Sequence, residues 1–190
     1  MMKRRKNLLL TVALVTLVLL SAVGCESRTD KIDGGGVLLS ISDFDGLPVQ
    51  ISVNNAGAVG LVQVGEIIIQ NVVKNPNEPT SQLQNVELES YEVIYTRQDT
   101  GTRLPPAFVR ELFSVVPVGG TATIENLPVM SLEQLDAEPL SDLLFQNGGF
   151  DSETGAQTIL LNLRIRFFGR TLSGDEVDTQ LAGFTVEFTP

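Results

Sequence analysis

The chain has 190 residues, with 23 acidic and 13 basic side chains, no histidine and one cysteine. The lack of histidine excludes Ser-His-Asp and Cys-His catalysis, and a single cysteine leaves none of the usual zinc sites. The acidic excess opposes binding to nucleic-acid phosphates. We therefore expect a non-enzyme with no catalytic residue, no metal, no cofactor and no nucleic-acid partner.

The first 25 residues contain the three parts of an export signal. Residues 3–6 are basic, the run from Leu8 to Leu20 is apolar, and small residues precede Cys25. As a helix, the apolar run would be about 20 Å long, whereas the hydrocarbon core of a bilayer is about 30 Å thick. A cleaved signal is therefore favoured, and a strained, uncleaved anchor that continues through Val23 is the alternative.

The motif Ser21-Ala22-Val23-Gly24-Cys25 resembles the lipobox of bacterial lipoproteins. In that family a diacylglyceryl group is attached to the cysteine sulfur, and a peptidase cuts directly before this residue. Ala22 departs from the family pattern, in which leucine is commoner at this position. The resemblance implies that the chain is exported and held at a membrane by lipid on Cys25. The alternative is that Cys25 is an incidental small apolar residue.

The sequence divides into a signal peptide (1–24), a lipidated flexible tether (25–36) and one β-sandwich domain (37–190). The tether is polar and ends in three glycines, without apolar periodicity. Glu26 rather than aspartate follows the cysteine, which by the sorting rule of enteric lipoproteins implies the outer membrane where two membranes exist. Without residues 1–24 the chain carries a formal charge of −14, since this segment holds four of the basic residues and no acidic one.

The domain begins with alternating apolar residues at 37–41 and again at 49–53, which predict two half-buried strands. Between them, Asp43 to Gly46 (DFDG) indicates a β-turn, and its likeness to the opening of a calcium loop is the alternative. The long apolar segment Leu61 to Val73 predicts a strand that is buried on both faces or bent by a bulge near Gly65.

Residues 75–84 (NPNEPTSQLQ) predict a loop. In the strand that follows, Val86 and Leu88 share one alternation, whereas Tyr91, Val93 and Tyr95 share the other. One extra residue near Glu89 and Ser90 would bring both sets to the same face, so we expect a bulge there.

The next strand is accompanied by Pro105, Pro106 and Pro117, which cannot donate a hydrogen bond to a neighbouring strand. We expect this strand to be an edge strand or an irregular crossing. The residues 118–121 (VGGT) are typical of a tight hairpin. Residues 131–145 predict the one helical insertion, in which Ser131 and Gln134 can form a capping box and Pro139 begins a second short helix.

The clearest strand runs from Ile159 to Phe168, with a strict alternation of apolar and polar residues, and we expect it at the centre of a sheet. A turn at 173–175 leads to the last strand, around Phe184 to Phe188. About eight strands at short intervals, with no βαβ alternation, predict an all-β fold, namely an antiparallel β-sandwich. A closed barrel is the alternative.

The stretches Ile165 to Phe188 and Tyr91 to Tyr95 resemble the paired strands of immunoglobulin-like domains in bacterial envelope lipoproteins. The resemblance implies an immunoglobulin-like β-sandwich, although the inter-sheet disulfide and core tryptophan of antibody domains are absent. Such modules are protein-interaction or accessory subunits of the envelope, so we expect an envelope protein partner. A glycan-binding lipoprotein, with Tyr91 and Tyr95 as aromatic platforms, and a carboxylate-dependent hydrolase are the alternatives.

Arg164 and Arg166 share the polar alternation of the expected central strand. We interpret this face as a candidate partner-binding surface. The alternative is that both arginines form structural ion pairs with acidic residues of a neighbouring strand, namely Glu87, Glu89 or Glu92.

Overall fold

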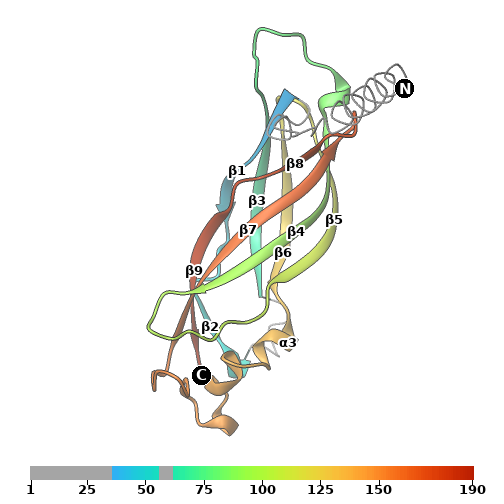
Figure 1. Cartoon of the computed structure of the whole chain (residues 1–190). Helices are drawn as coiled ribbons and strands as arrows, with labels where there is room; N and C mark the ends of the chain where they lie inside the picture. Colours follow the sequence, from blue (N-terminus) through green and yellow to red (C-terminus); the bar gives the residue numbers. More distant parts are fainter. Residues whose placement is uncertain (1–35, 56–61) are drawn as a thin grey trace, which may run out of the picture. The chain divides into compact units, whose positions relative to one another are not determined.

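A computed structural model of the chain describes residues 36–55 and 62–190 (Figure 1). These residues form two β-sheets, which confirms the prediction of an all-β, sandwich-like fold. The expected signal peptide at 1–24, Cys25 and all but the last residue of the expected tether lie outside the described residues. Among the residues that the structure describes, no helix is long and apolar enough to cross a membrane.

The smaller sheet has three antiparallel strands in the order β1-β3-β6. β1 spans Val37–Asp45, β3 spans Val62–Val73 and β6 spans Thr121–Met130. β3 pairs with both of its neighbours, so the long apolar segment is the middle strand of this sheet.

The core-facing side of β3 changes along the strand. Val62 and Val64 are buried near its start, whereas Ile67 and Ile69 are buried beyond it, one step out of alternation. The register with β6 is constant from Gln63 onward, so the change comes from the strand itself and not from a slip between strands. It occurs around Gly65, where the sequence predicted a bulge.

The larger sheet has six strands, of which five follow the order β2-β9-β7-β4-β5, while β8 also pairs with β7. The strands are β2 (Gln50–Ser52), β4 (Val86–Arg97), β5 (Phe108–Val116), β7 (Ile159–Thr171), β8 (Glu176–Asp178) and β9 (Ala182–Thr189). All pairings are antiparallel except that of β2 with β9, which is parallel.

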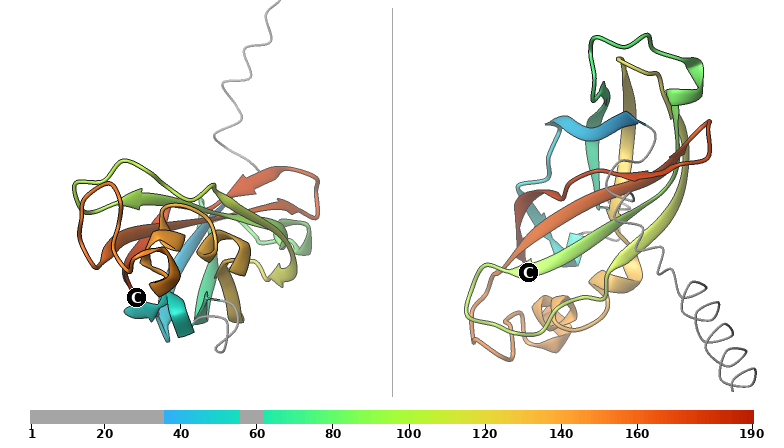
Figure 2. Two further views of the ribbon diagram at one scale, coloured as in Figure 1. Left: turned by 90° about the horizontal axis from the view of Figure 1, so that it is seen from below. Right: turned by 45° about the horizontal axis from the view of Figure 1, so that its top comes forward.

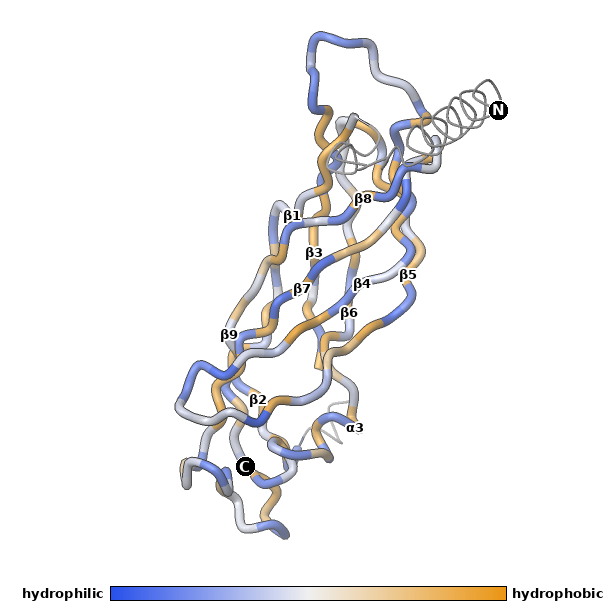
Figure 3. Tube along the Cα trace, viewed as in Figure 1, coloured by the Kyte–Doolittle hydropathy of each residue, from blue (hydrophilic) through white to orange (hydrophobic). Residues whose placement is uncertain are grey.

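Three predictions about the larger sheet are confirmed. β7 lies in the middle of the five-strand path, and its alternate residues from Ile159 to Phe167 are fully buried. β4 changes register between Leu88 and Ser90, where the alternation required an extra residue. β5 is an edge strand, and the prolines that indicated this position flank it. Hydrophobic and hydrophilic residues alternate along the strands of both sheets (Figure 3).

The two sheets lie in layers over one hydrophobic core (Figure 2). Two tyrosines of β4 join the layers: the hydroxyl of Tyr91 donates to the carbonyl oxygen of Pro128 at 2.7 Å, and that of Tyr95 donates to Val129 at 2.6 Å. Their exposed fractions are 1% and 2%. Burial raises the pKa of Tyr91 to about 12. Both tyrosines are therefore core residues and not an exposed platform for sugars.

The segment Asp43 to Gly46 is not the β-turn that the sequence predicted. β1 continues through Asp45, with a bulge between Ile41 and Asp43. The bulge shifts the alternation by one residue, so that the ring of Phe44 packs against the ring of Phe184 in the other sheet. The two ring centres are 5.9 Å apart. This one-residue shift explains why the alternation indicated a strand that ends at Ile41, four residues before the end of β1.

The turn after Pro117 is also different from the prediction. The backbone N–H of Gly120 donates to the carbonyl oxygen of Pro117 at 3.0 Å, so the tight turn itself is present. It does not close a hairpin, because β5 pairs with β4 and β6 pairs with β3. The turn residues determine the local reversal of the chain but not which sheet receives the next strand.

The helical insertion is confirmed as a series of short segments. α3 spans Leu132–Leu135 and has the predicted capping box between Ser131 and Gln134. Two 3₁₀ helices follow, η3 at Leu140–Leu143 and η4 at Phe145–Asn147. A further one, η2 at Gln82–Gln84, lies in the loop before β4.

Candidate functional site

The two arginines singled out from the sequence lie on the outer face of the larger sheet. Arg164 and Arg166 alternate with buried residues of β7, so their side chains leave the sheet on the side opposite the core. The structure gives the two arginines different surroundings. This difference separates the structural interpretation from the functional one.

Arg166 is an anchored side chain. Its Nη2 atom lies 3.2 Å from Oε2 of Glu92 in β4, and its Nη1 atom lies 3.7 Å from Oδ2 of Asp178 in β8. The guanidinium also lies over the ring of Phe168, 4.7 Å from the ring centre, in a cation–π contact. For Arg166, the structural interpretation from the sequence is confirmed, since Glu92 was one of the three partners named.

Arg164 has no such anchor. Its cross-strand neighbours are Ile94 on β4 and Gly183 on β9, neither of which carries a charge. Among the described residues, no ion pair of Arg164 is formed, and the side chain is exposed. A Cβ atom at Gly183 would lie 3.1 Å from Cγ of Arg164, so the glycine leaves room for the arginine side chain beside β9.

A groove of about 820 Å³ lies beside both arginines. It is lined by the first half of β1 on one side and by the connection from β8 to β9 on the other, through Leu38, Leu39, Ser40, Ile41, Arg164, Arg166, Asp178, Thr179, Gln180, Leu181 and Ala182. The groove thus combines an apolar wall with two cationic groups. Asp178 is its one carboxylate, and it faces Arg166.

The backbone around Thr179 determines the position of the groove. Thr179 and Phe167 exchange two hydrogen bonds, both of 3.0 Å, one through backbone atoms and one to the threonine hydroxyl. Thr179 also forms a parallel bridge with Leu39 of β1. The connection between β8 and β9 is therefore attached to both sheets, and the wall of the groove is held in place.

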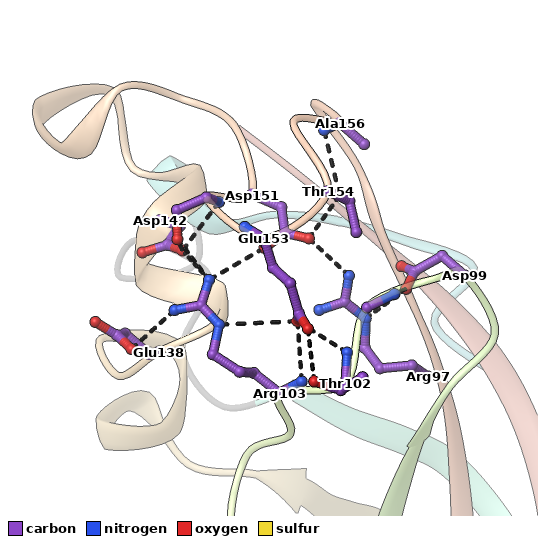
Figure 4. A network of polar contacts seen from close by, with 12 residues as sticks. Arg97, Asp99, Thr102, Arg103, Glu138, Asp142, Asp151, Glu153, Thr154 and Ala156 are labelled. Carbon is purple, nitrogen blue, oxygen red and sulfur yellow. Dashed lines mark hydrogen bonds and ion pairs between the residues drawn. The ribbon is translucent and has the colours of Figure 1, made fainter.

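A second group of charged side chains lies where the β4–β5 loop meets the loops around η3 and before β7 (Figure 4). At its centre, Arg97 binds Asp99 through Nε at 2.6 Å and Asp151 through Nη2 at 2.8 Å. The side chains of Arg97 and Asp151 are 3% and 0% exposed. The pair is a buried ion pair, of the kind that is costly to break by removing one partner. We call this group, with Arg103 and the carboxylates around it, the loop cluster.

Arg103 extends the loop cluster toward the surface. Its Nη1 atom lies 2.9 Å from Oε2 of Glu138, and its Nη2 atom lies 3.0 Å from Oδ2 of Asp142. Glu153 accepts hydrogen bonds from the backbone N–H groups of Thr102 and Arg103, at 2.8 Å and 3.0 Å. Each of the three loops is thereby held to the other two through side chains, as the dashed lines in Figure 4 show.

Three carboxylates of the loop cluster have a lowered pKa. Burial alone would raise the pKa of Asp151, but hydrogen bonds from Thr154 and Arg97 lower it to about 2. The pKa of Asp99 and of Asp142 is lowered in the same way, against the effect of burial, by bonds from Arg97 and Ser152. A carboxylic acid that donates a proton near neutral pH needs a raised pKa. These three groups have lowered values and so are poor proton donors.

The loop cluster was not predicted from the sequence. Its acidic and basic residues are spread over three loops far apart in the sequence, so no local spacing indicates it. Among the described residues, no group of three or more carboxylate, histidine or cysteine side chains could hold a metal ion. Asp43 and Asp45, the residues of the calcium alternative, accept backbone hydrogen bonds from Phe44 and Gly46 instead.

Cys25, the predicted lipidation site, lies outside the described residues. Comparison of the sequence with protein-family models gives no match, and no curated protein matches it. The interpretation of function therefore depends on the chain's own residues.

Proposed function

We propose that this chain is a lipid-anchored, non-catalytic binding module of the cell envelope, in which the groove beside Arg164 holds an acidic, extended segment of a partner protein. The export signal and Cys25 support the anchor and the location. The observation that carries the binding role is Arg164: an exposed arginine without an ion pair among the described residues, beside a groove with an apolar wall.

The strand order supports an immunoglobulin-like module. In immunoglobulin domains, strands A, B and E belong to one sheet and strands C, F and G to the other. Taken in chain order, β1, β3 and β6 correspond to A, B and E, and β4, β7 and β9 correspond to C, F and G. β5, next to β4, then takes the position of the additional strand C′ of variable-type domains.

The charge of the groove favours an acidic partner segment. The chain is strongly acidic after residue 24, so an anionic ligand is repelled over most of the surface. Arg164 and Arg166 outnumber Asp178 in the groove, and Asp178 is engaged by Arg166. Hydrogen bonds between an arginine and carboxylates are charge-assisted and can be bidentate. Arg164 is available for such a contact.

Binding of a labelled peptide of alternating valine and glutamate tests this proposal. We expect the intact chain, purified in detergent, to bind the peptide, and Arg164→Glu to weaken binding by about tenfold or more, as for loss of an interface residue worth over 1 kcal/mol. Arg170→Glu is the matched control, because Arg170 lies on the same face of β7 but outside the groove. Equal loss in both variants would contradict the proposal.

Labelling with a radioactive fatty acid tests the anchor separately. We expect Cys25→Ser to abolish incorporation of the label and to leave an unprocessed precursor, because two acyl chains on this residue provide the stable membrane attachment. A variant that is processed and retained like the unmodified chain would overturn the lipoprotein interpretation while leaving the groove proposal open to its own test.

The alternative functions have less support. The two tyrosines considered as sugar platforms are buried in the core. A hydrolase with two carboxylates needs one that acts as an acid, and Asp99, Asp142 and Asp151 in the loop cluster have lowered pKa values. We therefore prefer a protein-interaction or accessory subunit.

A further inference from the structure

β5 is the longest edge strand of the larger sheet in the described part of the chain. It is nine residues long and pairs with β4 on one side only. Its sequence, FVRELFSVV, contains no proline, glycine or lysine. Natural proteins commonly protect such edges with these features, with bulges or with very short strands, because the free N–H and C=O groups can pair with another strand.

The other edges have such protection. β2 has three residues. β6 contains Pro128 and a positive φ of 52° at Asn126. β1 is interrupted by a bulge after Ile41 and is bridged to Thr179. β5 has an irregularity of its own, since its pairing with β4 shifts register between Glu111 and Ser114 and Arg110 lies on its core-facing side opposite Tyr91, but it is long and contains no proline.

The outer face of β5 is apolar. Phe113 is 80% exposed, Val109 is 63% exposed and Val115 is 40% exposed. The three residues alternate along the strand, so they form one stripe next to the free backbone edge. Exposed apolar residues that lie together on a surface mark interaction sites more often than scattered ones do.

The charge on the stripe itself is Glu111, since Arg110 lies on the other face of β5, opposite Tyr91, and Glu92 of β4 is paired with Arg166. Glu111 is exposed and lies between Val109 and Phe113 on the same face of β5. On β4, Glu87 lies opposite Val115 and Glu92 lies opposite Val109. A strand added to β5 would bring its own side chains directly opposite Val109, Glu111, Phe113 and Val115. Apolar residues and one basic residue, opposite Glu111, would complement this pattern.

We propose that β5 is a second docking edge, which adds an extended segment of a partner protein that presents apolar residues and a basic residue opposite Glu111. A second copy of this chain fits less well, because the formal charge of −14 beyond residue 24 would bring two strongly acidic bodies together. The site is separate from the groove, which β5 does not line.

A capped nine-residue peptide tests this proposal on the intact chain in detergent. Its outer alternation is valine, valine, lysine, valine, with threonine at the other positions, so that in antiparallel pairing the lysine faces Glu111. We expect binding to increase hydrogen-exchange protection in residues 108–116. Replacing the peptide's lysine by glutamate should weaken binding about fivefold, since unlike and like charge pairs across strands differ by about 1 kcal/mol.

Three variants of the chain and one modified peptide make the test specific. Glu111→Lys should reverse the preference, so that the glutamate peptide binds better than the lysine peptide. Phe113→Lys should weaken binding about tenfold, as for a central interface aromatic, whereas Phe145→Lys, at a residue 73% exposed in η4, should not change it. A peptide that is N-methylated at the alternate residues whose N–H groups face β5 should not bind, because these groups can then no longer donate to the strand.

Each contrary result overturns the proposal. These results are the absence of binding, protection outside β5, or an unchanged preference in Glu111→Lys. Concentration-dependent dimerisation of the chain that Phe113→Lys abolishes would assign the edge to a second copy instead. Circular dichroism spectra of the variants that match the unmodified chain exclude misfolding as the cause of lost binding.

Discussion

The loop cluster and the outer face of β7 use the same residue types in opposite ways. In the loop cluster, Arg97 is 3% exposed and is held by two carboxylates. On β7, Arg164 is exposed and has no ion pair among the described residues. The comparison shows that the burial and partners of an arginine, rather than its presence, separate a structural role from an available binding group.

The largest expected difference between the regions is in stability. Arg97→Ala should lower the free energy of unfolding by about 3 to 5 kcal/mol, because it removes the nearer of the two guanidinium groups at the buried carboxylate of Asp151 and leaves only Arg103, at 3.5 Å. Arg164→Ala should change it by less than about 0.5 kcal/mol, as for an exposed residue away from special features. Urea denaturation followed by circular dichroism measures both. Similar losses in the two variants would contradict the comparison.

Gly101→Ala should break the loop cluster without removing any charge. A Cβ atom at this position would lie 2.4 Å from Cζ of Arg97, so the guanidinium would have to leave its position between Asp99 and Asp151. We expect a loss of about 2 to 3 kcal/mol, at the upper end for single substitutions. Gly120→Ala, whose nearest contact is the Pro117 side chain at 3.3 Å, should cost clearly less in the same denaturation experiment.

Acid should weaken the loop cluster. The pKa of Asp151 falls from an ordinary 3.8 to about 2 on folding, so the unfolded chain binds more protons between these values. Its stabilising effect is therefore complete above about pH 5 and is lost toward pH 2, on the order of 2 kcal/mol for this group. Denaturation curves measured from pH 6 to pH 2 test this. Arg97→Ala should have a flatter dependence, and an equally steep one would contradict the assignment.

A small effect is expected at Arg166. Its contacts with Glu92 and Asp178 are partly exposed, so Arg166→Ala should cost under about 1 kcal/mol, and less in high salt. The measurement is the same denaturation at low and high salt. A loss that is large and independent of salt would show that the outer face, like the loop cluster, is built mainly for stability.

The sequence predicted the strands where alternation is strict. β7, β9 and the bulge in β4 follow from the spacing of apolar residues, because one buried face imposes a period of two. It failed where a bulge changes the alternation, as at Asp43 in β1, and where the turn after Pro117 takes the chain from one sheet to the other. Both depend on which strands become neighbours, and this is a property of the whole fold.

The candidate site was predicted only in part. The polar alternation of β7 indicated Arg164 and Arg166, but both looked equivalent, since the uncharged neighbours Ile94 and Gly183 come from different strands. The groove and the loop cluster each combine segments that are distant in sequence. Without knowledge of the strand order, no spacing of residues indicates them.

Site-specific photo-crosslinking in the native envelope tests the central claim most directly. A photoreactive residue replaces Gln180, which is exposed and lines the groove, or Gln157, which is exposed in the loop before β7. We predict a discrete crosslinked partner from position 180 that Arg164→Glu removes and Arg170→Glu retains, and no such product from position 157. A product at 157 alone, or one at 180 that is unchanged by Arg164→Glu, would contradict the account.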